Sequence, residues 1–492
     1  MACEKLQLQF FFFPAMAQGH MIPMVDMARL FASRGIKATI VTTPINAALI
    51  SKSLERTTVN ILTFKFPSAE VGLPEGCENV DTTPPHLLPN LFMASQKMQD
   101  PIDKILRDHR PDCLVADWFF PWATDVAGRY NIPRIEFNAT SFFNVCVTHC
   151  MHLYKPFRNV SSDSEPFVIP NLPDVIQMTR LQFPYHVNRD EVTESDTQNG
   201  VRESSELKSY GSLFYSFNDL EPAYVDYFRK VLGRKGWSVG PLSLCFRNME
   251  GRTHRGGEAA IDEHECLKWL DSQEPYSVIY ICFGSLSNFN ESQLREIAFA
   301  LEACGHQFVW VVRKSMQKKD DQEEHEEDWL PEGFEKRTKG KGLIIRGWAP
   351  QVVILEHKAV GAFLTHCGWN SVLEGVAVGV PMVTWPVFAD HFCNEQLVTQ
   401  VLRIGVPVGV KKWVTLIGDS VKREAIEKAV KRIMAGEDAE KMRARAKALA
   451  EKAKHAVEEG GSSMVDLEAL IQEIASRRVA VDACKLPVQF SS

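Results

Sequence analysis

A turn between an apolar run and a helical pattern carries side chains that could bind an anion. The segment HCGWNS, residues 366–371, follows the apolar run, and the helical pattern begins at Val372. Backbone N–H groups at the start of a helix lack partners within it, and the helix dipole is positive there. Gly368 permits close backbone approach. Further donors come from the side chains of His366, Asn370 and Ser371. The pattern indicates a diphosphate seat, with an ordinary capped helix as the alternative.

Two further side chains at the ends of apolar runs could take part in proton transfer. His20 directly follows Gly19 after the first run, and Asp117 ends a later one. Imidazole has an unperturbed pKa near neutrality, which suits a general base. The residues alone favour a loop histidine and a helix-capping aspartate, and Asp125 is a rival carboxylate, so the catalytic interpretation stays open.

These side chains need strands to position them. Residues 6–13 form an apolar run apart from Gln7 and Gln9, and an amphipathic stretch follows over 23–34. This pattern predicts a buried strand, a loop and a helix. Similar apolar runs recur at 38–42, 61–66, 113–116 and 134–137 in the first half, and at 277–283, 307–312, 343–346, 362–365 and 382–385 in the second. Strands that alternate with helices predict one parallel sheet in each half.

A chain of 492 residues is long enough for two domains. We expect an N-terminal domain over 1–245, a linker over 246–260 and a C-terminal domain over 261–460. A final helix and tail, 461–492, should pack back toward the N-terminal domain. In open α/β sheets of this kind, small ligands bind at the carboxyl ends of the strands.

Composition excludes several classes of partner. The formal net charge is -7 and no long basic block occurs, which argues against nucleic acid or an anionic membrane surface. The acidic run over 320–328 is typical of a solvated loop. No apolar stretch approaches the roughly 20 residues of a membrane span. The 12 cysteines form no CxxC pair, and the first apolar run lacks a basic leader, so we expect a cytoplasmic protein with reduced thiols.

The residues from Trp348 to His391 read WAPQVVILEHKAVGAFLTHCGWNSVLEGVAVGVPMVTWPVFADH. This segment resembles the plant secondary-product glycosyltransferase box, which marks the UDP-binding half of family 1 glycosyltransferases. The tryptophans, the HCGWNS core, Glu374 and Asp390 match in register. The resemblance extends through QGH at 18–20, CLKWLD at 266–271, FGS at 283–285 and GGSS at 460–463.

The resemblance implies a GT-B fold, in which two Rossmann-like, doubly wound parallel-sheet domains face a cleft. It also implies inverting transfer of a hexose from a UDP-sugar to a hydroxyl of a small lipophilic plant metabolite. The chain is most similar to the branch that acts on triterpenoids, steroids and flavonoids, judged from ARLF at 28–31 and SYGSLF at 209–214. No metal ion is expected to be required, because the helix terminus, His366 and Ser285 can neutralise the diphosphate. The protein is expected to be a monomer.

The resemblance also assigns roles to single positions. His20 would be the general base that takes the acceptor proton, and Asp117 would hydrogen-bond and orient its ring. The nucleoside would be held by Trp348, Ala349, Gln351 and Glu374, with Glu374 on the ribose hydroxyls. The diphosphate would contact Ser285, His366, Gly368, Asn370 and Ser371. The hexose would be contacted by Trp369, Asp390 and His391, with Gly19 and Thr140 approaching the donor from the first domain.

The sequence departs from the family's commonest form at the end of the box. Glucosyltransferases usually carry Gln there, whereas His391 is a substitution associated with galactose users. Both side chains can hydrogen-bond a hydroxyl. We therefore expect glucose slightly ahead of galactose as the donor sugar.

A structural scaffold would have no reason to carry the whole glycosyltransferase box, so the sequence favours a transferase over it. A UDP-sugar or small-molecule binding protein of the same fold, without catalysis, is the main alternative. An NAD-dependent oxidoreductase is weak, because PAMAQGH stands at 14–20 where GxGxxG would follow the first strand. The acceptor should be held by residues 71–91 and by Phe142, Phe143 and Phe183, although such apolar residues are more often core than pocket.

Overall fold

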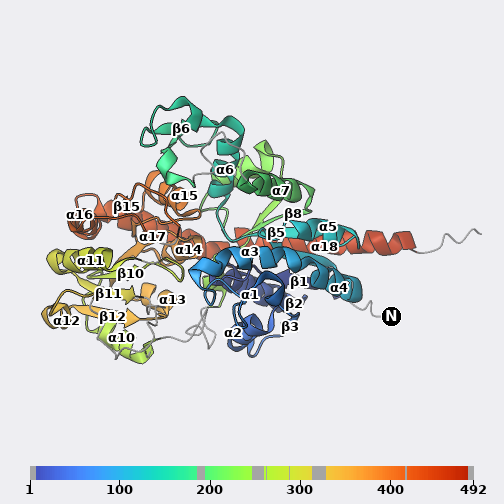
Figure 1. Ribbon diagram of the computed structural model, residues 1–492, viewed down its shortest axis with the longest axis horizontal. Coiled ribbons are helices and arrows are strands. Elements are labelled where there is room, and N and C mark those ends of the chain that lie inside the picture. The colour runs from blue at the N-terminus through green and yellow to red at the C-terminus, as the bar shows by residue number, and fades with distance from the viewer. Residues whose placement is uncertain are drawn as a thin grey trace, which may run out of the picture. The chain divides into compact units, whose positions relative to one another are not determined.

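The computed structural model describes residues 7–184, 194–246, 260–261, 263–287, 289–312, 329–415 and 418–485. The chain divides into two compact units (Figure 1). Unit 1 holds residues 1–139, 197–245 and 455–492, and unit 2 holds residues 140–196 and 246–454. The expected limits at 245 and 260 stay a prediction, because most of the expected linker lies outside the described residues, as does the acidic run over 320–328.

Unit 1 is built around a parallel sheet of seven strands in the order β3-β2-β1-β4-β5-β8-β9. The strands are β1 (Gln9–Phe13), β2 (Lys37–Thr42), β3 (Asn60–Thr63), β4 (Cys113–Asp117), β5 (Arg134–Asn138), β8 (Gly211–Phe214) and β9 (Gly236–Ser238). Phe10 and Phe12 of β1 contact Phe31 on one face, and Phe11 and Phe13 join the core on the other. Because β1 is covered on both faces, its sequence is apolar at every position from Phe10 to Phe13.

Helices lie on both faces of this sheet (Figure 1). They are α1 (Gln18–Ser33), α2 (Pro44–Leu54), α3 (Leu88–Lys97), α4 (Gln99–His109), α5 (Trp122–Gly128), α7 (Glu194–Lys208), α8 (Pro222–Asp226), α9 (Leu242–Cys245) and α18 (Ser462–Lys485). The last of them, α18, packs near β9, where Ser463 Oγ donates to the Gly240 carbonyl at 2.6 Å and Asp466 accepts from the Ser238 N–H at 2.8 Å. Helix α18 is thereby part of unit 1.

Unit 2 contains a parallel sheet of six strands in the order β12-β11-β10-β13-β14-β15. The strands are β10 (Val278–Cys282), β11 (Gln307–Val312), β12 (Gly342–Arg346), β13 (Val360–Thr365), β14 (Met382–Thr384) and β15 (Gly405–Pro407). Its helices are α6 (Phe142–Tyr154), α10 (Glu263–Asp271), α11 (Glu291–Cys304), α12 (Phe334–Arg337), α13 (Gln351–Leu355), α14 (Trp369–Val378), α15 (His391–Gln396), α16 (Arg423–Ala435) and α17 (Ala439–Ala456). A two-stranded hairpin, β6 (Phe167–Ile169) and β7 (Ile176–Met178), completes the unit.

The strand orders locate one ligand-binding position in each unit. In unit 1 the order reverses between β1 and β4, and in unit 2 it reverses between β10 and β13. In open α/β sheets, ligands bind beyond the carboxyl ends of strands at such a switch point. The residues that directly follow these four strands are therefore the natural site candidates.

The two parallel sheets expected from the sequence are confirmed, and two helix starts were predicted too late. The first helix begins at Gln18 rather than at residue 23. Proline usually marks the start of a helix, but Pro23 lies inside this one, and the predicted start was therefore too late. As a result His20 lies in the first turn of α1 and not in a loop. Likewise α14 begins at Trp369 rather than at Val372, with Gly368 as its N-cap residue.

Within the part of the chain that the structure describes, no helix combines the length and the apolar character that crossing a bilayer requires.

Candidate functional site

The side chains of His20 and Asp117 meet at the switch point of unit 1. His20 Nδ1 lies 2.8 Å from Asp117 Oδ2. The other carboxylate oxygen, Oδ1, accepts the backbone N–H of Phe119 at 3.1 Å, and Asp117 is completely buried. In the neutral ring an Nδ1–H that donates to this carboxylate leaves Nε2 as a proton acceptor. The pair has the geometry of an oriented general base.

The rival carboxylate of Asp125 takes no part in this pair. Its side chain is 71% exposed and lies 3.8 Å from Lys208 Nζ. Gly19 directly precedes His20 in the first turn of α1, and a Cβ atom at Gly19 would meet no other atom within 4 Å. Packing within unit 1 therefore leaves the space beside Gly19 open.

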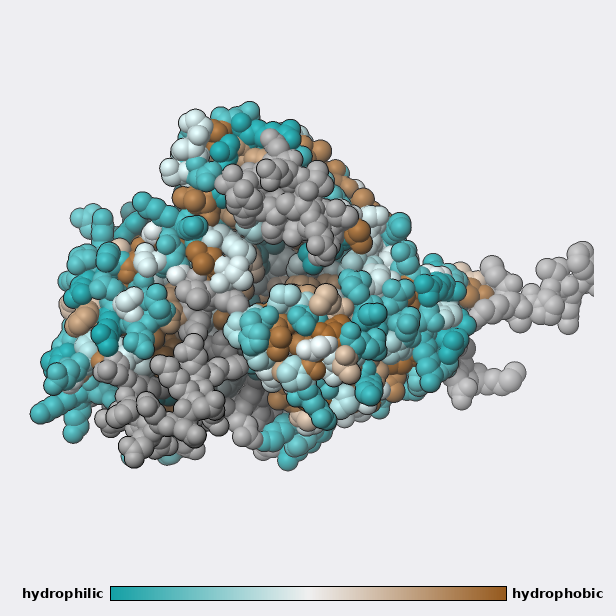
Figure 2. Space-filling view, viewed as in Figure 1, coloured by the Kyte–Doolittle hydropathy of each residue, from teal (hydrophilic) through white to brown (hydrophobic). Residues whose placement is uncertain are grey.

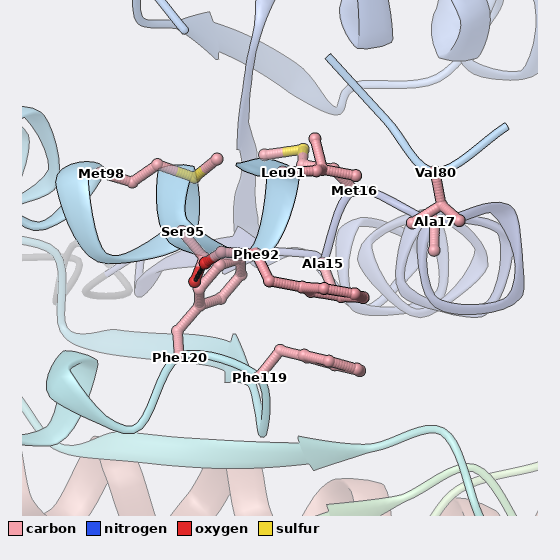
Figure 3. Close-up of a pocket in the computed structure, with 10 residues that line it drawn as sticks. All are labelled: Ala15, Met16, Ala17, Val80, Leu91, Phe92, Ser95, Met98, Phe119 and Phe120. Atoms are coloured by element: carbon pink, nitrogen blue, oxygen red, sulfur yellow. Dashed lines mark hydrogen bonds between the residues drawn. The ribbon is translucent and has the colours of Figure 1, made fainter. Parts of the chain in front are cut away.

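An apolar pocket adjoins His20 in unit 1. Its walls come from the turn after β1, from α3 and from the Phe119–Phe120 pair (Figure 3). Phe119 belongs to both features, because its ring also contacts the His20 ring edge-on at 5.2 Å between centroids. The cavity volume is about 40 Å³, which suits one part of an organic ligand rather than a whole one.

The pocket opens near apolar surface on α3. Phe92, one of its lining residues, is 49% exposed, and its ring is nearly parallel to that of Phe119 at 6.1 Å between centroids. Figure 2 shows apolar side chains gathered over α3 on the viewed face, where Phe92 and its neighbour Met93 are exposed. The pocket therefore offers flat aromatic faces beside His20.

Of the residues expected to hold the acceptor, the segment 71–91 contributes Val80 and Leu91 to this pocket. The three phenylalanines expected there do not line it. Phe142 and Phe143 are completely buried in α6 of unit 2, and Phe183 stacks on Phe167 of β6. Their expected role at the acceptor stays a prediction. All three side chains are buried, as apolar side chains in such a pattern usually are.

In unit 2 the turn between β13 and α14 has a fixed backbone. Cys367 adopts a left-handed conformation with φ of 65°, and its N–H donates to Thr365 Oγ1 at 3.2 Å. Its carbonyl accepts from Asn394 Nδ2 at 2.9 Å. This turn leads into the first turn of α14, which contains Trp369, Asn370 and Ser371. The N–H groups at the start of α14 make the turn suitable for an anion.

The imidazole of His366 fits between two glycines beside this turn. A Cβ atom at Gly284 or Gly368 would lie 2.5 or 2.4 Å from His366 Nε2, so neither position has room for a side chain. Burial lowers the pKa of His366 to about 4, so the ring is neutral at pH 7. Its buried Nδ1 has no hydrogen-bond partner among the described residues. Ser285 follows Gly284 directly, after β10, at the same switch point.

The residues expected at the hexose also lie together in unit 2. Thr140 Oγ1 donates to Asp390 Oδ2 at 2.6 Å, and the ring of His391 contacts that of His366 at 4.8 Å between centroids. Burial, with His366 nearby, holds the pKa of His391 well below its usual range. His391 Nδ1 accepts the Phe388 N–H at 3.3 Å, so the neutral ring carries its proton on Nε2. Trp369 is buried at the same turn.

The residues expected at the nucleoside form a third group in unit 2. Gln351, at the start of α13, donates from Nε2 to Glu374 Oε2 at 2.7 Å and to Ser371 Oγ at 3.0 Å. The carboxylate of Glu374 on α14 is buried. Trp348 and Ala349 lie in the turn between β12 and α13.

The sequence did not identify Gly284 or Phe119 as site residues. Gly284 lies against His366 and directly precedes Ser285, and Phe119 contacts His20.

The described residues contain no group of three or more His, Cys, Asp or Glu side chains that could hold a metal ion. The candidate residues fall into two sets: His20, Asp117 and Gly19 lie in unit 1, and the others lie in unit 2. His20 and Asp117 follow β1 and β4, and Ser285 and His366 follow β10 and β13, which are the strands at which the order of each sheet reverses. The roles assigned to these residues stay predictions.

Comparison with known proteins places these two units in one family. Residues 255–450 match the family model described as UDP-glucoronosyl and UDP-glucosyl transferase. The chain is 54% identical to scopoletin glucosyltransferase of Nicotiana tabacum, over 96% of this chain and 98% of that protein. It is 52% identical to UDP-glucose flavonoid 3-O-glucosyltransferase 7 of Fragaria ananassa, over 95% and 96% of the two chains.

A solved structure agrees along the whole chain. The crystal structure of Glycyrrhiza uralensis UGT73P12, complexed with glycyrrhetinic acid 3-O-monoglucuronide, superposes with a TM-score of 0.90 at 40% identity. The alignment covers 97% of this chain and 98% of that one. The GT-B fold of two Rossmann-like domains is thereby confirmed. The chain belongs to the UDP-glycosyltransferase family, whose members are hexosyltransferases that take a UDP-sugar as co-substrate.

Proposed function

We propose that this chain is an inverting glucosyltransferase that forms a β-O-glycoside on a hydroxyl of a small lipophilic plant metabolite. The observation that carries this proposal is the 2.8 Å contact between His20 Nδ1 and Asp117 Oδ2 beside an apolar pocket. A protein that only binds UDP-sugar would have no need of an oriented base next to such a pocket. The contact therefore supports catalysis over binding alone.

The proposed reaction is a single displacement. His20 Nε2 removes the proton from the acceptor hydroxyl as the oxygen attacks the anomeric carbon of the sugar. The bond from that carbon to the UDP oxygen breaks in the same step, and UDP leaves with the bonding electrons. Attack opposite the leaving group inverts the anomeric carbon, so an α-linked donor gives a β-glycoside. Asp117 stabilises the imidazolium that forms.

The diphosphate accumulates negative charge as UDP leaves. In this proposal it is stabilised by the N–H groups at the start of α14 and by a hydrogen bond from the neutral ring of His366. These groups are fixed before the reaction by the glycines around His366 and by the Cys367 turn. Donors that are already oriented need no reorganisation as charge develops.

We propose a triterpenoid, a steroid or a flavonoid as the acceptor. The pocket beside His20 supports a lipophilic compound, because most of its lining is apolar or aromatic. The names of the relatives point to more than one class, since the Nicotiana protein is named for scopoletin and the Fragaria protein for flavonoids. The Glycyrrhiza structure holds glycyrrhetinic acid 3-O-monoglucuronide, which supports testing acceptors that already carry a sugar.

We propose glucose as the preferred donor sugar, ahead of galactose. The Nicotiana and Fragaria relatives are named glucosyltransferases. His391 offers only the Nε2–H donor, because its Nδ1 accepts the Phe388 N–H, whereas a glutamine would offer an acceptor as well.

We also propose that the protein is cytoplasmic and monomeric. The absence of disulfide bonds among the described cysteines supports the cytoplasmic location.

The donor choice is tested by competition between UDP-glucose and UDP-galactose. Purified protein with a panel of saponin aglycones, saponin monoglycosides and flavonoids is expected to transfer glucose faster. His391→Gln should raise the ratio of kcat/KM for UDP-glucose over UDP-galactose by about 3- to 10-fold, which is the effect of one hydrogen bond. An unchanged ratio would remove His391 from donor recognition, and UDP binding without consumption of either donor would favour the binding-protein alternative.

A further inference from the structure

Strand β5 carries two charged residues in the middle of the unit 1 sheet. It reads RIEFN, so Arg134, Glu136 and Asn138 alternate with Ile135 and Phe137. A strand that is buried on both faces of a parallel sheet is normally apolar throughout. Arg134 is nonetheless only 2% exposed and Glu136 only 6%, and Arg134 Nη1 lies 2.6 Å from Glu136 Oε2.

A second nitrogen of the Arg134 guanidinium contacts the strand that carries Asp117. Its Nη2 donates to the carbonyl oxygens of Ala116 at 3.2 Å and Asp117 at 3.0 Å, at the very end of β4. Strand β5 runs parallel to β4, with Ala116 opposite Glu136 and Asp117 opposite Phe137. Arg134 therefore holds the backbone at the point where the Asp117 side chain leaves the sheet.

The same buried network reaches the residues beyond Asp117. Arg134 Nη1 also donates to Thr124 Oγ1 at 3.3 Å, and that hydroxyl lies 2.8 Å from Ser205 Oγ of α7. Ser205 Oγ donates in turn to the Pro121 carbonyl at 2.6 Å. Residues 116–121 are thus held at their start by Arg134 and at their end by Ser205. Asp117 lies within that segment.

A buried ion pair of this kind is a poor way to stabilise a sheet. Removing two charges from water costs about as much as their attraction returns, and apolar residues of similar volume often stabilise a protein equally well. Apolar residues at 134 and 136 could not, however, donate hydrogen bonds to the carbonyls of β4. The specific contribution of Arg134 is therefore the orientation of this backbone, and Glu136 neutralises its charge.

We propose that Arg134, paired with Glu136, is a positioning residue that aligns the Asp117 carboxylate with His20. The inference rests on the proposed function, because it matters for turnover only if His20 is the base. A shift of the β4 terminus moves Asp117 Oδ2 away from His20 Nδ1 and lets the ring rotate. Loss of such alignment lowers the rate of the chemical step by up to about 100-fold while donor binding in unit 2 is untouched.

The test compares variants that remove the network without leaving an unpaired buried charge. The double variant Arg134→Met/Glu136→Met keeps the side-chain volume and is expected to fold. It should keep the dissociation constant for UDP and the KM for UDP-glucose, while kcat falls about 10- to 100-fold. The matched control is Lys230→Met/Asp226→Met, which removes an exposed ion pair from the same unit and should leave kcat unchanged.

A purely structural role is separated from positioning by repeating the double change in an Asp117→Asn background. If Arg134 acts through the Asp117 carboxylate, the reductions in kcat from the two changes will not multiply. The double change will then lower the kcat of Asp117→Asn by less than about 3-fold. A full additional loss in that background, or an unchanged kcat in the folded double variant, would overturn the proposal. If the double variant fails to fold, Arg134→Lys provides the test, because lysine keeps the charge but cannot span both carbonyls. A lowered kcat at constant KM would then support the positioning role of Arg134, and an unchanged kcat would overturn it.

The failure of the proposed function gives a different result. If Asp117→Asn by itself leaves turnover unchanged, the His20–Asp117 pair is not the catalytic base, whatever the variants at Arg134 do. If Asp117→Asn lowers turnover but the Arg134 variants do not, only the positioning inference is wrong.

Discussion

Replacement of His20 by alanine is expected to lower kcat by about 10²- to 10⁴-fold, the usual contribution of a positioned general base. The ring of His20 is held by Asp117 at 2.8 Å and by the edge-on contact with Phe119, so Nε2 is presented in a fixed orientation. UDP affinity should stay at the wild-type value, because the residues expected to hold the nucleoside and the diphosphate lie in unit 2. Steady-state kinetics and calorimetric titration with UDP measure the two quantities.

The control for this variant is His455→Ala. The His455 side chain is 75% exposed and pairs with nearby Glu458 in an exposed contact, so its removal should change neither quantity. Turnover by His20→Ala at the wild-type rate would refute the base assignment. A large loss of UDP affinity in the same variant would instead show that His20 serves the donor.

Glu374→Ala is expected to weaken UDP binding by on the order of 100-fold or more. A hydrogen bond to a charged group is worth about 1.5–3 kcal/mol, and the proposed role gives the carboxylate two ribose hydroxyls. Glu374 is buried and already oriented by Gln351 Nε2 at 2.7 Å, so little freedom is lost when the ribose binds. Calorimetry with UDP, and with uracil alone as a ligand that lacks ribose, measures the effect.

The matched control is Glu424→Ala, which removes an exposed glutamate from α16 of the same unit and should leave UDP affinity unchanged. A Glu374→Ala variant that binds UDP as tightly as the wild type would show that Glu374 does not hold the ribose. Its carboxylate would then serve only the start of α14 and the amide of Gln351.

The sheets could be predicted because buried parallel strands leave a plain pattern. Runs such as Phe10–Phe13 are apolar at every position, since helices cover both faces of the sheet. Strands β9 and β15 were not predicted, because glycine, serine or proline fills two of the three positions in each of them. The start of α1 was missed because Pro23 suggests a boundary where the helix in fact continues.

Most residues expected to bind the donor could be grouped from the sequence because they belong to one continuous segment, 348–391. Contacts between distant segments left no comparable pattern in the sequence. His20 and Asp117 are 97 residues apart, and Thr140 and Asp390 are 250 apart. Only the fold brings each pair together. The aromatic residues show the limit most clearly, since Phe142 and Phe119 look alike in the sequence, yet one is core and the other borders the pocket.

The central claim is that His20 drives a single displacement on a UDP-sugar, and the anomeric configuration of the product tests it most directly. Purified protein is given UDP-glucose, whose sugar is α-linked, and an acceptor that it consumes, and the product is analysed by proton NMR. We predict a β-glucoside as the only anomer, with its formation abolished in His20→Ala. An α-glucoside, or a β-glucoside formed at the same rate without His20, would contradict the account.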